Sequence, residues 1–330
     1  MKALVIQPDL SFKIQEKEIP VPGDGEALIK VTAASLNRRD QWIREGKYPS
    51  IIPGVTLGSD AVGEVVKVGG QAESPWLGKK VVVNPNINWG DDDETQQDGY
   101  HVLGLPKDGA LAEYLVTNLD RLIEKPKHLT DTEAGALPLS ALTAYRACFN
   151  KGGVQKGVKV LISGFGGGVA QMATIFSITV GAETYITSSN KANIALAKEK
   201  GAREGFDYTE KDWYKNVKRR HGGFDVIIDS SGGNQFGQLI KLLNPKGRLV
   251  FYGATNGLPA TIDLYTMFWR QLSVVGTTMG SDKEFERMVE FVKSFHIIPI
   301  IGSERPFDEA IAALDAMKKG GIVGKSVLTF

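Results

Sequence analysis

The apolar positions in the first third of the chain fall into short, β-branched segments separated by Gly, Pro or Asp turns. These segments read MKALVIQ, FKIQEKEIP, EALIKVTAASL, AVGEVVKVGG, KKVVVNP and ALAEYLVT. Short strands separated in this way are typical of an all-β barrel or sandwich. A helical pattern over residues 38–45 interrupts them, and residues 84–100 form a polar, acidic stretch that predicts a long loop.

From about residue 131 the pattern changes to strands that alternate with helices. A helix is predicted over residues 131–149, with Thr130 or Asp131 as its cap and Glu133 in its first turn. Near-continuous apolar strands that alternate with helices are typical of a parallel, doubly wound α/β sheet. The strands are predicted at residues 159–163, 183–187, 225–229, 248–252 and 272–276, and the intervening helices end near residues 180, 200 and 243.

The C-terminal part adds two helical patterns, at residues 282–295 and 307–319, and a last strand at residues 325–330. We expect that strand to return to the β-rich domain. The predicted organisation is therefore a β-rich domain at residues 1–125, a doubly wound domain at residues 126–280, and a return to the first domain at residues 281–330.

A glycine-rich turn lies between the first strand of the predicted sheet and the helix that follows it, in the stretch VKVLISGFGGGVAQMATIF. Its members are Gly164, Gly166, Gly167 and Gly168, and Val169 stands where the strict G-x-G-x-x-G spacing requires glycine. Such a turn lets backbone N–H groups approach a phosphate, and the helix N-terminus adds partial positive charge. The turn therefore predicts a dinucleotide-binding site, although glycines also occur in such turns for tight packing alone.

The end of the second strand of a dinucleotide fold distinguishes NADH from NADPH, because a carboxylate there accepts from the ribose 2′-hydroxyl. Residues 186–191 contain no carboxylate, whereas Ser188, Ser189 and Lys191 suit a 2′-phosphate. This end of the strand therefore favours NADPH. The alternative is that Ser189 only caps the next helix and Lys191 is solvated. Tyr208 is predicted to lie along the adenosine phosphate or, alternatively, to pack in the core.

Composition narrows the classes of protein that remain. A length of 330 residues suggests two domains, and a net charge of +1 gives no electrostatic reason to expect nucleic acid or a membrane surface as a partner. We find no signal-peptide pattern at the start and no apolar run long enough to span a bilayer, so we expect a cytoplasmic protein. The single cysteine, Cys148, excludes an internal disulfide framework and predicts a buried, inert thiol.

Taken together and in order, several motifs are specific enough to indicate a family. They are Ala34-Ser-Leu-Asn37-Arg-Arg-Asp40, Gly46-Lys-Tyr48-Pro49, Pro53-Gly54, Leu57-Gly58-Ser59-Asp60-Ala-Val-Gly63, Leu137-Pro138, Leu142-Thr143-Ala144-Tyr145, the GFGGGVA turn and Gly321-Ile-Val-Gly324-Lys325. Over nearly its whole length the chain resembles the medium-chain dehydrogenase/reductase superfamily, in its zinc-free, quinone oxidoreductase-like branch. The resemblance implies a GroES-like β-rich catalytic domain, a Rossmann domain, NADPH as cofactor, and a homodimer or homotetramer.

The resemblance also bears on zinc. Zinc-dependent relatives carry a Cys where this chain has Asn37, a Gly-His-Glu where it has Gly58-Ser59-Asp60, and four closely spaced Cys in a structural lobe. With one cysteine and four histidines, neither zinc site can be built here, so no metal is expected. One departure concerns the cofactor: NADPH-using relatives often place a phosphate-binding Lys nearer Asn193 than Lys191 lies.

Reduction of a quinone or an α,β-unsaturated carbonyl needs donors to the oxygen on which negative charge builds, and water can supply the proton. Asn37 resembles the family residue beside the nicotinamide, and its amide could donate to that oxygen. The resemblance implies that Tyr48 is a pocket residue, and its phenol is a hydrogen-bond donor rather than a base at neutral pH. The alternatives are that Asn37 only caps the short helix and that Tyr48 only walls the pocket.

The resemblance implies further cofactor contacts, for each of which ordinary turn chemistry is the alternative. They are Thr143, Ser231, Tyr252, Gly253, Thr277, Thr278 and Lys325, beside Gly164, Gly166, Gly167, Gly168, Val169, Ser188, Ser189, Lys191 and Tyr208 from the segments above. The expected function is NADPH-dependent, zinc-independent reduction of a small quinone or enone. The alternatives are a carbonyl or enoyl-thioester reductase of the same fold and a non-catalytic NADPH-binding protein.

Overall fold

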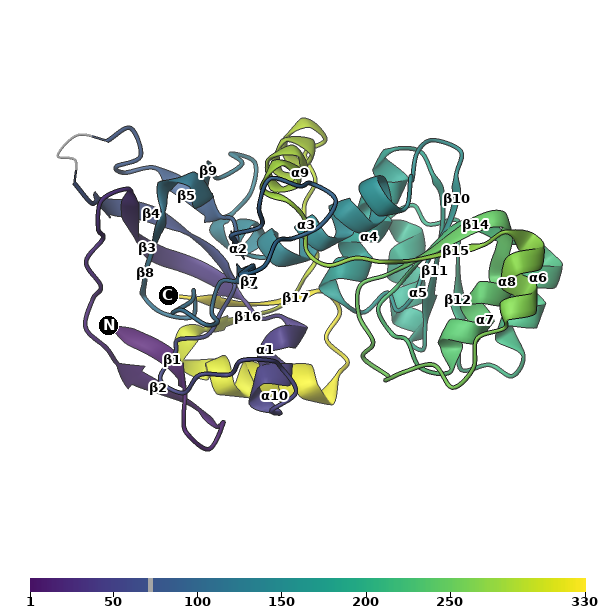
Figure 1. Cartoon of the computed structure of the whole chain (residues 1–330), viewed down its shortest axis with the longest axis horizontal. Helices are drawn as coiled ribbons and strands as arrows, with labels where there is room; N and C mark the ends of the chain where they lie inside the picture. The colour runs from purple at the N-terminus through teal and green to yellow at the C-terminus, as the bar shows by residue number, and fades with distance from the viewer. Residues whose placement is uncertain (71–73) are drawn as a thin grey trace. The chain divides into compact units, whose positions relative to one another are not determined.

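The computed structural model describes residues 1–70 and 74–330, which form two compact units (Figure 1). The first unit contains Met1–Leu142 and Gly280–Phe330, and the second contains Thr143–Met279. The domain limits predicted at residues 125 and 280 stay predictions.

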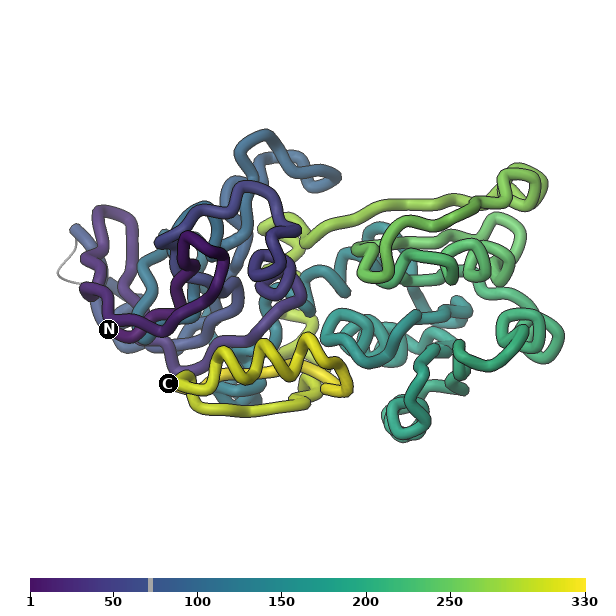
Figure 2. Tube along the Cα trace, turned by 90° about the horizontal axis from the view of Figure 1, so that it is seen from below, coloured from purple at the N-terminus to yellow at the C-terminus, as the bar shows by residue number. Residues whose placement is uncertain are grey.

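A seven-stranded sheet forms the centre of the first unit. Its strand order is β16 (Ile301–Pro306), β17 (Lys325–Thr329), β3 (Glu26–Ser35), β4 (Asp60–Val68), β5 (Lys80–Val83) and β9 (Leu122–Glu124), with β8 (Tyr114–Asn118) also paired to β3. The predicted return of the C-terminal strand is confirmed, because β17 pairs antiparallel with β3. Figure 2 shows the yellow C-terminal segment lying along the purple N-terminal part of the chain.

Smaller elements complete this unit. They are the hairpin β1 (Lys2–Ile6) and β2 (Phe12–Glu16), the short pair β6 (Asn86–Ile87) and β7 (His101–Val102), and the helices α1 (Arg38–Arg44), α2 (Asp131–Gly135), α9 (Asp282–Ser294) and α10 (Ala310–Lys319). Alternating β-branched residues of the sheet bury one face against α10 in a common apolar core. Gly63 of β4 is required there, because a Cβ atom would lie 2.2 Å from the Lys30 carbonyl oxygen.

The helix predicted at residues 131–149 is broken in the structure. Helix α2 ends at Gly135, α3 (Pro138–Tyr145) begins at a proline, and a π-helical turn follows at Arg146–Lys151. Proline has no backbone N–H and therefore suits the first turn of a helix rather than its interior. Cys148 lies buried in this turn, where desolvation raises the pKa of its thiol to about 12, which agrees with the expected inert thiol.

A six-stranded parallel sheet forms the second unit, in the order β12 (Glu204–Asp207), β11 (Glu183–Ser188), β10 (Lys159–Ile162), β13 (Phe224–Asp229), β14 (Leu243–Phe251) and β15 (Ser273–Gly276). This order, 3-2-1-4-5-6 along the chain, is that of a doubly wound dinucleotide-binding fold, which confirms the predicted fold class. The helices are α4 (Gly168–Thr179), α5 (Lys191–Glu199), α6 (Trp213–His221), α7 (Gln235–Leu242) and α8 (Leu264–Arg270) (Figure 1). The sequence pattern missed β12 and α8 and, in the first unit, β6, β7, β9 and β16.

Apart from the short strand β6, the acidic stretch at residues 84–100 is a loop, as predicted, and part of it is buried. Asn84, Asn86 and Trp89 are buried, and the Asn86 amide donates to the Gly280 carbonyl at 2.6 Å. Asp282, at the start of α9, accepts from Asn84 at 2.9 Å. These bonds fasten the stretch to the N-terminal end of α9.

Among the residues that the structure describes, no helix is long and apolar enough to cross a membrane.

Candidate functional site

The glycine turn of the second unit has the geometry that a phosphate cradle needs. Gly164 follows β10 with φ +68°, and its N–H donates to the Thr187 hydroxyl at 3.1 Å. Helix α4 begins at Gly168, with Gly167 as its N-cap residue in an extended conformation. The first N–H groups of a helix have no partner within that helix. A Cβ atom built on Gly167 would meet no atom within 4 Å, so the turn leaves room for a ligand near those N–H groups.

Ser231, which follows the neighbouring strand β13, is a second predicted cofactor contact that lies beside this turn. Asp229, at the end of β13, accepts from the Ser163 hydroxyl and from the Gly232 N–H at 2.9 Å. These bonds join the ends of β10 and β13. A Cβ atom on Gly164 would lie 3.7 Å from the Ser231 Oγ atom. Two residues predicted separately as cofactor contacts therefore lie side by side at the carboxyl ends of parallel strands, where such sheets bind ligands.

The polar side chains at the end of β11 differ in their exposure to solvent. Ser188 is buried, and its hydroxyl accepts from the Asn190 N–H and the Asn193 amide, each at 3.2 Å. Ser189 and Lys191 are exposed, and the Tyr208 hydroxyl donates to Ser189 Oγ at 3.2 Å. The Ser188 hydroxyl is thus hydrogen-bonded within the protein, whereas the side chains of Ser189 and Lys191 face solvent. The carboxylate nearest in the sheet, Asp207 on β12, is bonded to Thr209 in its own turn.

The other predicted cofactor residues of this unit lie at strand ends or on the first helix turns. Tyr252 follows β14 and donates its N–H to the Asp229 carbonyl at 3.0 Å, and burial raises the pKa of its phenol. Thr277 follows β15, and its hydroxyl has no hydrogen-bond partner among residues 1–70 and 74–330. Val169 lies in the first turn of α4, Gly253 and Thr278 follow Tyr252 and Thr277, and Thr143 Oγ1 lies 3.8 Å from Met279 Sδ.

In the first unit the sheet register assembles a buried polar cluster around Asn37. Strand β17 pairs Val327 with Ser35, and continuing that register places Lys325 opposite Asn37. The Lys325 ammonium donates to Asn37 Oδ1 at 2.6 Å. Strand β4 pairs Asp60 with Ser35, and Asp60 accepts from the Asn37 amide nitrogen at 2.9 Å. Asn37 is the N-cap residue of α1, but its side chain is directed at Lys325 and Asp60.

Tyr48 lies beside a buried arginine. The Arg39 guanidinium lies 5.0 Å from the centre of the Tyr48 ring and donates from Nε to the phenol oxygen at 3.4 Å. Its Nη1 atom donates to the Leu103 carbonyl at 2.7 Å, which holds the guanidinium in place. The phenol oxygen therefore accepts from a cation and keeps its own proton to donate. This contact orients the Tyr48 ring.

Burial perturbs the protonation of Asp40, near the start of helix α1. Its Oδ2 atom accepts from the Asn37 N–H at 2.7 Å, while Oδ1 has no hydrogen-bond partner in the described part of the chain. Desolvation raises the pKa of Asp40 from its ordinary 3.8 to about 6, against the opposing effects of the Arg39 guanidinium and the Asn37 N–H. The Asp40 carboxyl therefore bonds the backbone of the N-cap residue of helix α1.

This pKa predicts a pH-dependent stability difference. Because the folded pKa is raised, Asp40 favours folding at low pH, and this contribution is lost as pH rises through about 6. Relative to Asp40→Asn, the wild-type free energy of unfolding should fall by about 3 kcal/mol between about pH 4 and pH 7. Urea unfolding across this range measures the difference.

The control is Asp9→Asn, because Ser11 lowers the pKa of the exposed Asp9 carboxylate. The wild-type advantage over this variant should change in the opposite direction with pH. If the free energies of unfolding of Asp40→Asn and wild type change equally with pH across this range, the pKa of Asp40 is not raised.

Several residues of these clusters were missed or underrated by sequence reasoning. Asp60, Arg39, Ser35 and Asn193 were given no functional role, although each is buried and polar. The sequence carried one usable signal for Asp60, namely a carboxylate at the head of the apolar strand DAVGEVVKV. Its partners could not be found in this way, because Lys325 is 265 residues distant along the chain.

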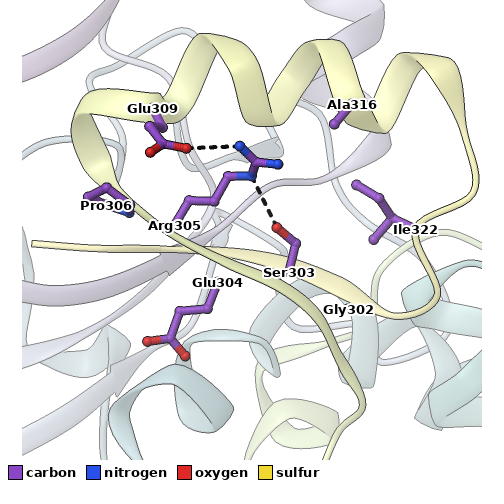
Figure 3. A pocket seen from close by; sticks show the side chains of 8 residues that line it. All are labelled: Gly302, Ser303, Glu304, Arg305, Pro306, Glu309, Ala316 and Ile322. Atoms are coloured by element: carbon purple, nitrogen blue, oxygen red, sulfur yellow. Dashed lines mark hydrogen bonds and ion pairs between the residues drawn. The ribbon is translucent and has the colours of Figure 1, made fainter.

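Within the described residues, no group of three or more His, Cys, Asp or Glu side chains is arranged to hold a metal ion. A surface cavity of about 440 Å³ lies between β16 and α10 of the first unit (Figure 3). Its arginine, Arg305, is already bonded to Ser303 and Glu309, and none of the predicted site residues lines it.

Comparison with known proteins relates both units to dehydrogenases. Residues 23–127 match the alcohol dehydrogenase GroES-like domain, and residues 168–294 match the zinc-binding dehydrogenase family. The zinc-type alcohol dehydrogenase-like protein YogA of Leptosphaeria maculans is 32% identical over 322 residues, which are 93% of this chain and 90% of that protein. The quinone oxidoreductase of Homo sapiens is 26% identical over 321 residues, covering 94% and 91% of the two chains.

Solved structures agree with these relationships. The crystal structure of an NAD-dependent alcohol dehydrogenase is 32% identical, covers 100% of both chains and superposes with a TM-score of 0.94. The expected combination of a GroES-like unit with a doubly wound parallel sheet is confirmed by these matches.

Proposed function

Because this chain belongs to the medium-chain dehydrogenase/reductase superfamily, whose oxidoreductases bind a nicotinamide cofactor, we propose that it is an NADPH-dependent, zinc-independent reductase of quinones or α,β-unsaturated carbonyls. The observation that carries the proposal is the side-chain set around Asn37. The Asn37 amide and the Asp60 carboxylate occupy positions where the zinc-dependent relatives have metal ligands, and both are bonded to each other and to the Lys325 ammonium.

This donor set does not fit a zinc ion. Zinc prefers thiolate and imidazole ligands, and Asn37, Ser59 and Asp60 supply an amide, a hydroxyl and one carboxylate. The Lys325 ammonium lies 3.0 Å from Asp60 and would repel a second cation at the same carboxylate. We therefore propose chemistry that proceeds without a Lewis acid.

Quinones and enones suit such a site because hydride addition leaves the negative charge on an oxygen that hydrogen bonds can stabilise. The bound NADPH would supply the hydride to the electrophilic carbon. Asn37 would donate from its amide N–H to the substrate oxygen, and Tyr48 would donate from its phenol. The resulting enolate or hydroquinone anion takes its proton from water, so no buried acid is needed.

The second unit offers the groups that would hold the cofactor. Gly164, Gly166, Gly167, Gly168 and Val169 would receive the pyrophosphate, and Ser231 would lie beside it. Unused polar atoms support a polar ligand in this unit, because Asn193 Oδ1 and Thr277 Oγ1 are buried without partners among the described residues. Thr143, Tyr252, Gly253 and Thr278 complete the proposed contacts.

Selectivity for NADPH is proposed to come from Ser189, Lys191 and Tyr208 rather than from the internally bonded Ser188. Lys191→Ala should raise the Kd of NADPH about tenfold and leave that of NADH nearly unchanged, because only NADPH offers a phosphate to the ammonium. Fluorescence titration with both cofactors measures the ratio. Lys198→Ala, an exposed lysine at the other end of α5, serves as the control and should change neither value. Equal losses for both cofactors in Lys191→Ala would contradict the phosphate assignment.

The proposed reaction is tested by mixing the purified protein with NADPH and a panel of quinones and enones, with and without a chelator. NADPH oxidation that depends on the acceptor and survives the chelator is the expected result. NAD-linked alcohol oxidation that the chelator abolishes would overturn the proposal and favour the zinc-type reading of its relatives. Binding of NADPH without turnover on any acceptor would instead favour the non-catalytic class. Turnover confined to carbonyls or enoyl thioesters would favour the alternative reductase.

We also propose that the protein assembles with copies of itself through one edge of the second unit, as a homodimer or a homotetramer. Strand β15 is an edge strand, and edge strands expose unpaired backbone groups. The side chains of α8 are unusually exposed for their type, at 66% for Leu264, 80% for Tyr265, 64% for Phe268 and 81% for Trp269. An apolar surface of this kind marks an interaction site.

The double variant Phe268→Glu, Trp269→Glu should therefore reduce the mass measured by light scattering to that of one 35.8 kDa chain. Phe295→Glu, at a comparably exposed phenylalanine of the first unit, serves as the control and should leave the assembly intact. A wild-type protein that already behaves as a single chain would refute the assembly.

A further inference from the structure

Lys325 carries no spare hydrogen-bond donor. Its side chain is 5% exposed, and the ammonium donates to the Leu36 carbonyl at 3.0 Å, to Asn37 Oδ1 at 2.6 Å and to Asp60 Oδ2 at 3.0 Å. An ammonium has three N–H donors and no acceptor, so these three oxygens take all of them. A direct bond to a cofactor would require one of these bonds to break.

Asp60 is equally committed. Its carboxylate is fully buried, and Oδ2 accepts from Lys325, from the Asn37 amide at 2.9 Å and from the Ser35 hydroxyl at 2.7 Å. The other oxygen, Oδ1, accepts from the Leu139 N–H at 2.8 Å. A buried ion pair is tolerated only when both partners have further hydrogen bonds, and this pair meets that condition.

The pair fixes the orientation of the Asn37 carboxamide. Oδ1 faces the ammonium and Nδ2 faces the carboxylate, whereas the flipped amide would set two donors against Lys325 and an oxygen against Asp60. The second Nδ2 hydrogen points to Ser59 Oγ at 3.4 Å, which is long for an N–H···O bond. This weakly engaged hydrogen is the one that a substrate oxygen could take.

We propose that the Lys325–Asp60 ion pair is a positioning device for the reaction, which holds the Asn37 amide with its nitrogen as the donor and polarises it through the cation on Oδ1. This inference rests on the proposed function, in which Asn37 donates to the substrate oxygen. It makes Lys325 a residue that acts through Asn37 rather than a cofactor contact. A hydrogen bond to a charged partner strengthens the next bond in a chain, so the cation makes Asn37 a better donor.

The test uses Lys325→Met, Asp60→Asn and the double variant in the full-length protein. Lys325→Met should lower kcat with the best acceptor about 30-fold and change the Kd of NADPH less than twofold. It should also lower the melting temperature, because it leaves Asp60 buried without its partner. The double variant removes both charges and should recover the melting temperature but not kcat, since the amide is no longer held.

Lys125→Met is the matched control. Lys125 is also largely buried in the first unit and contacts a carbonyl, that of Leu129, and a carboxylate, that of Asp131 at 3.3 Å. This variant loses an ion pair whose partners, Leu129 and Asp131, are not among the groups bonded to Asn37, and kcat should stay at the wild-type value.

A second readout does not depend on activity. In protein labelled with ¹⁵N-asparagine, the Asn37 side-chain NH₂ signals are identified by their loss in Asn37→Ser. Lys325→Met should shift these signals and speed their exchange with water, and Lys125→Met should not. If wild-type protein reduces no acceptor, the proposed function fails, while this measurement still decides the orientation of the amide.

Three results would overturn the inference. They are unchanged Asn37 amide signals in Lys325→Met, recovery of kcat together with stability in the double variant, and a tenfold weaker NADPH affinity with unchanged kcat. The last of these would return Lys325 to the cofactor contacts.

Discussion

Gly164→Val should weaken NADPH binding about 1000-fold while the protein stays folded. Gly164 has φ +68°, a region that β-branched residues avoid, so valine would draw the backbone toward negative φ. That movement would break the N–H bond to Thr187 at 3.1 Å and displace the following N–H groups of the turn. Losing two charge-assisted bonds to the pyrophosphate costs about 4 kcal/mol, which corresponds to that factor.

Gly157→Val separates strain from binding in this experiment. Gly157 also has positive φ, at +83°, and a Cβ atom there would meet nothing within 4 Å. Both variants should lose similar thermal stability, but only Gly164→Val should lose affinity in a fluorescence titration. If NADPH binds the Gly164→Val protein normally, the pyrophosphate does not lie at this turn and the cofactor assignment is wrong.

Asn37→Ala should lower kcat/KM for quinones or enones between about 100-fold and 1000-fold, the loss that follows removal of one donor to a developing oxyanion. The affinity for NADPH should stay within about twofold of wild type, because the proposed role of Asn37 is toward the substrate. Steady-state kinetics beside cofactor titration separate the two effects.

Asn84→Ala provides the comparison for this variant. Asn84 is also a buried asparagine of the first unit whose amide bonds a carboxylate, that of Asp282 at 2.9 Å. Its replacement should affect stability to a similar extent and leave kcat/KM unchanged. An Asn37→Ala protein that turns over at the wild-type rate would remove Asn37 from the chemistry.

The protein's architecture was readable from the sequence because local patterns encode it. Strand-forming segments separated by turns predicted the β-rich unit, and apolar strands that alternate with helices predicted the parallel sheet. The glycine turn of 164–168 was recognisable because backbone conformation there depends on the residues themselves. The weakest local signals failed, as at β12 and α8, where four-residue and seven-residue elements carry little periodicity.

Local pattern does not specify which distant side chains meet. Trp89 is buried although its segment is polar and acidic, and its indole N–H donates to the Asp92 carbonyl within the same segment at 2.9 Å. Ser188 and Lys191 look equivalent in the sequence, yet one is bonded internally and the other faces solvent. Only the folded chain distinguishes a residue that supports the site from one that is free to bind a ligand.

The sequence by itself determined the two kinds of sheet, the position of the glycine turn and the absence of the residues that build a zinc site. The tertiary structure decided that Asn37, Asp60 and Lys325 form one buried cluster. The physical reason is strand register. Because β17 and β4 both pair with β3, Lys325 comes into hydrogen-bond contact with Asp60, which lies 265 positions earlier in the chain. Register depends on packing of the whole sheet, so no local segment contains it.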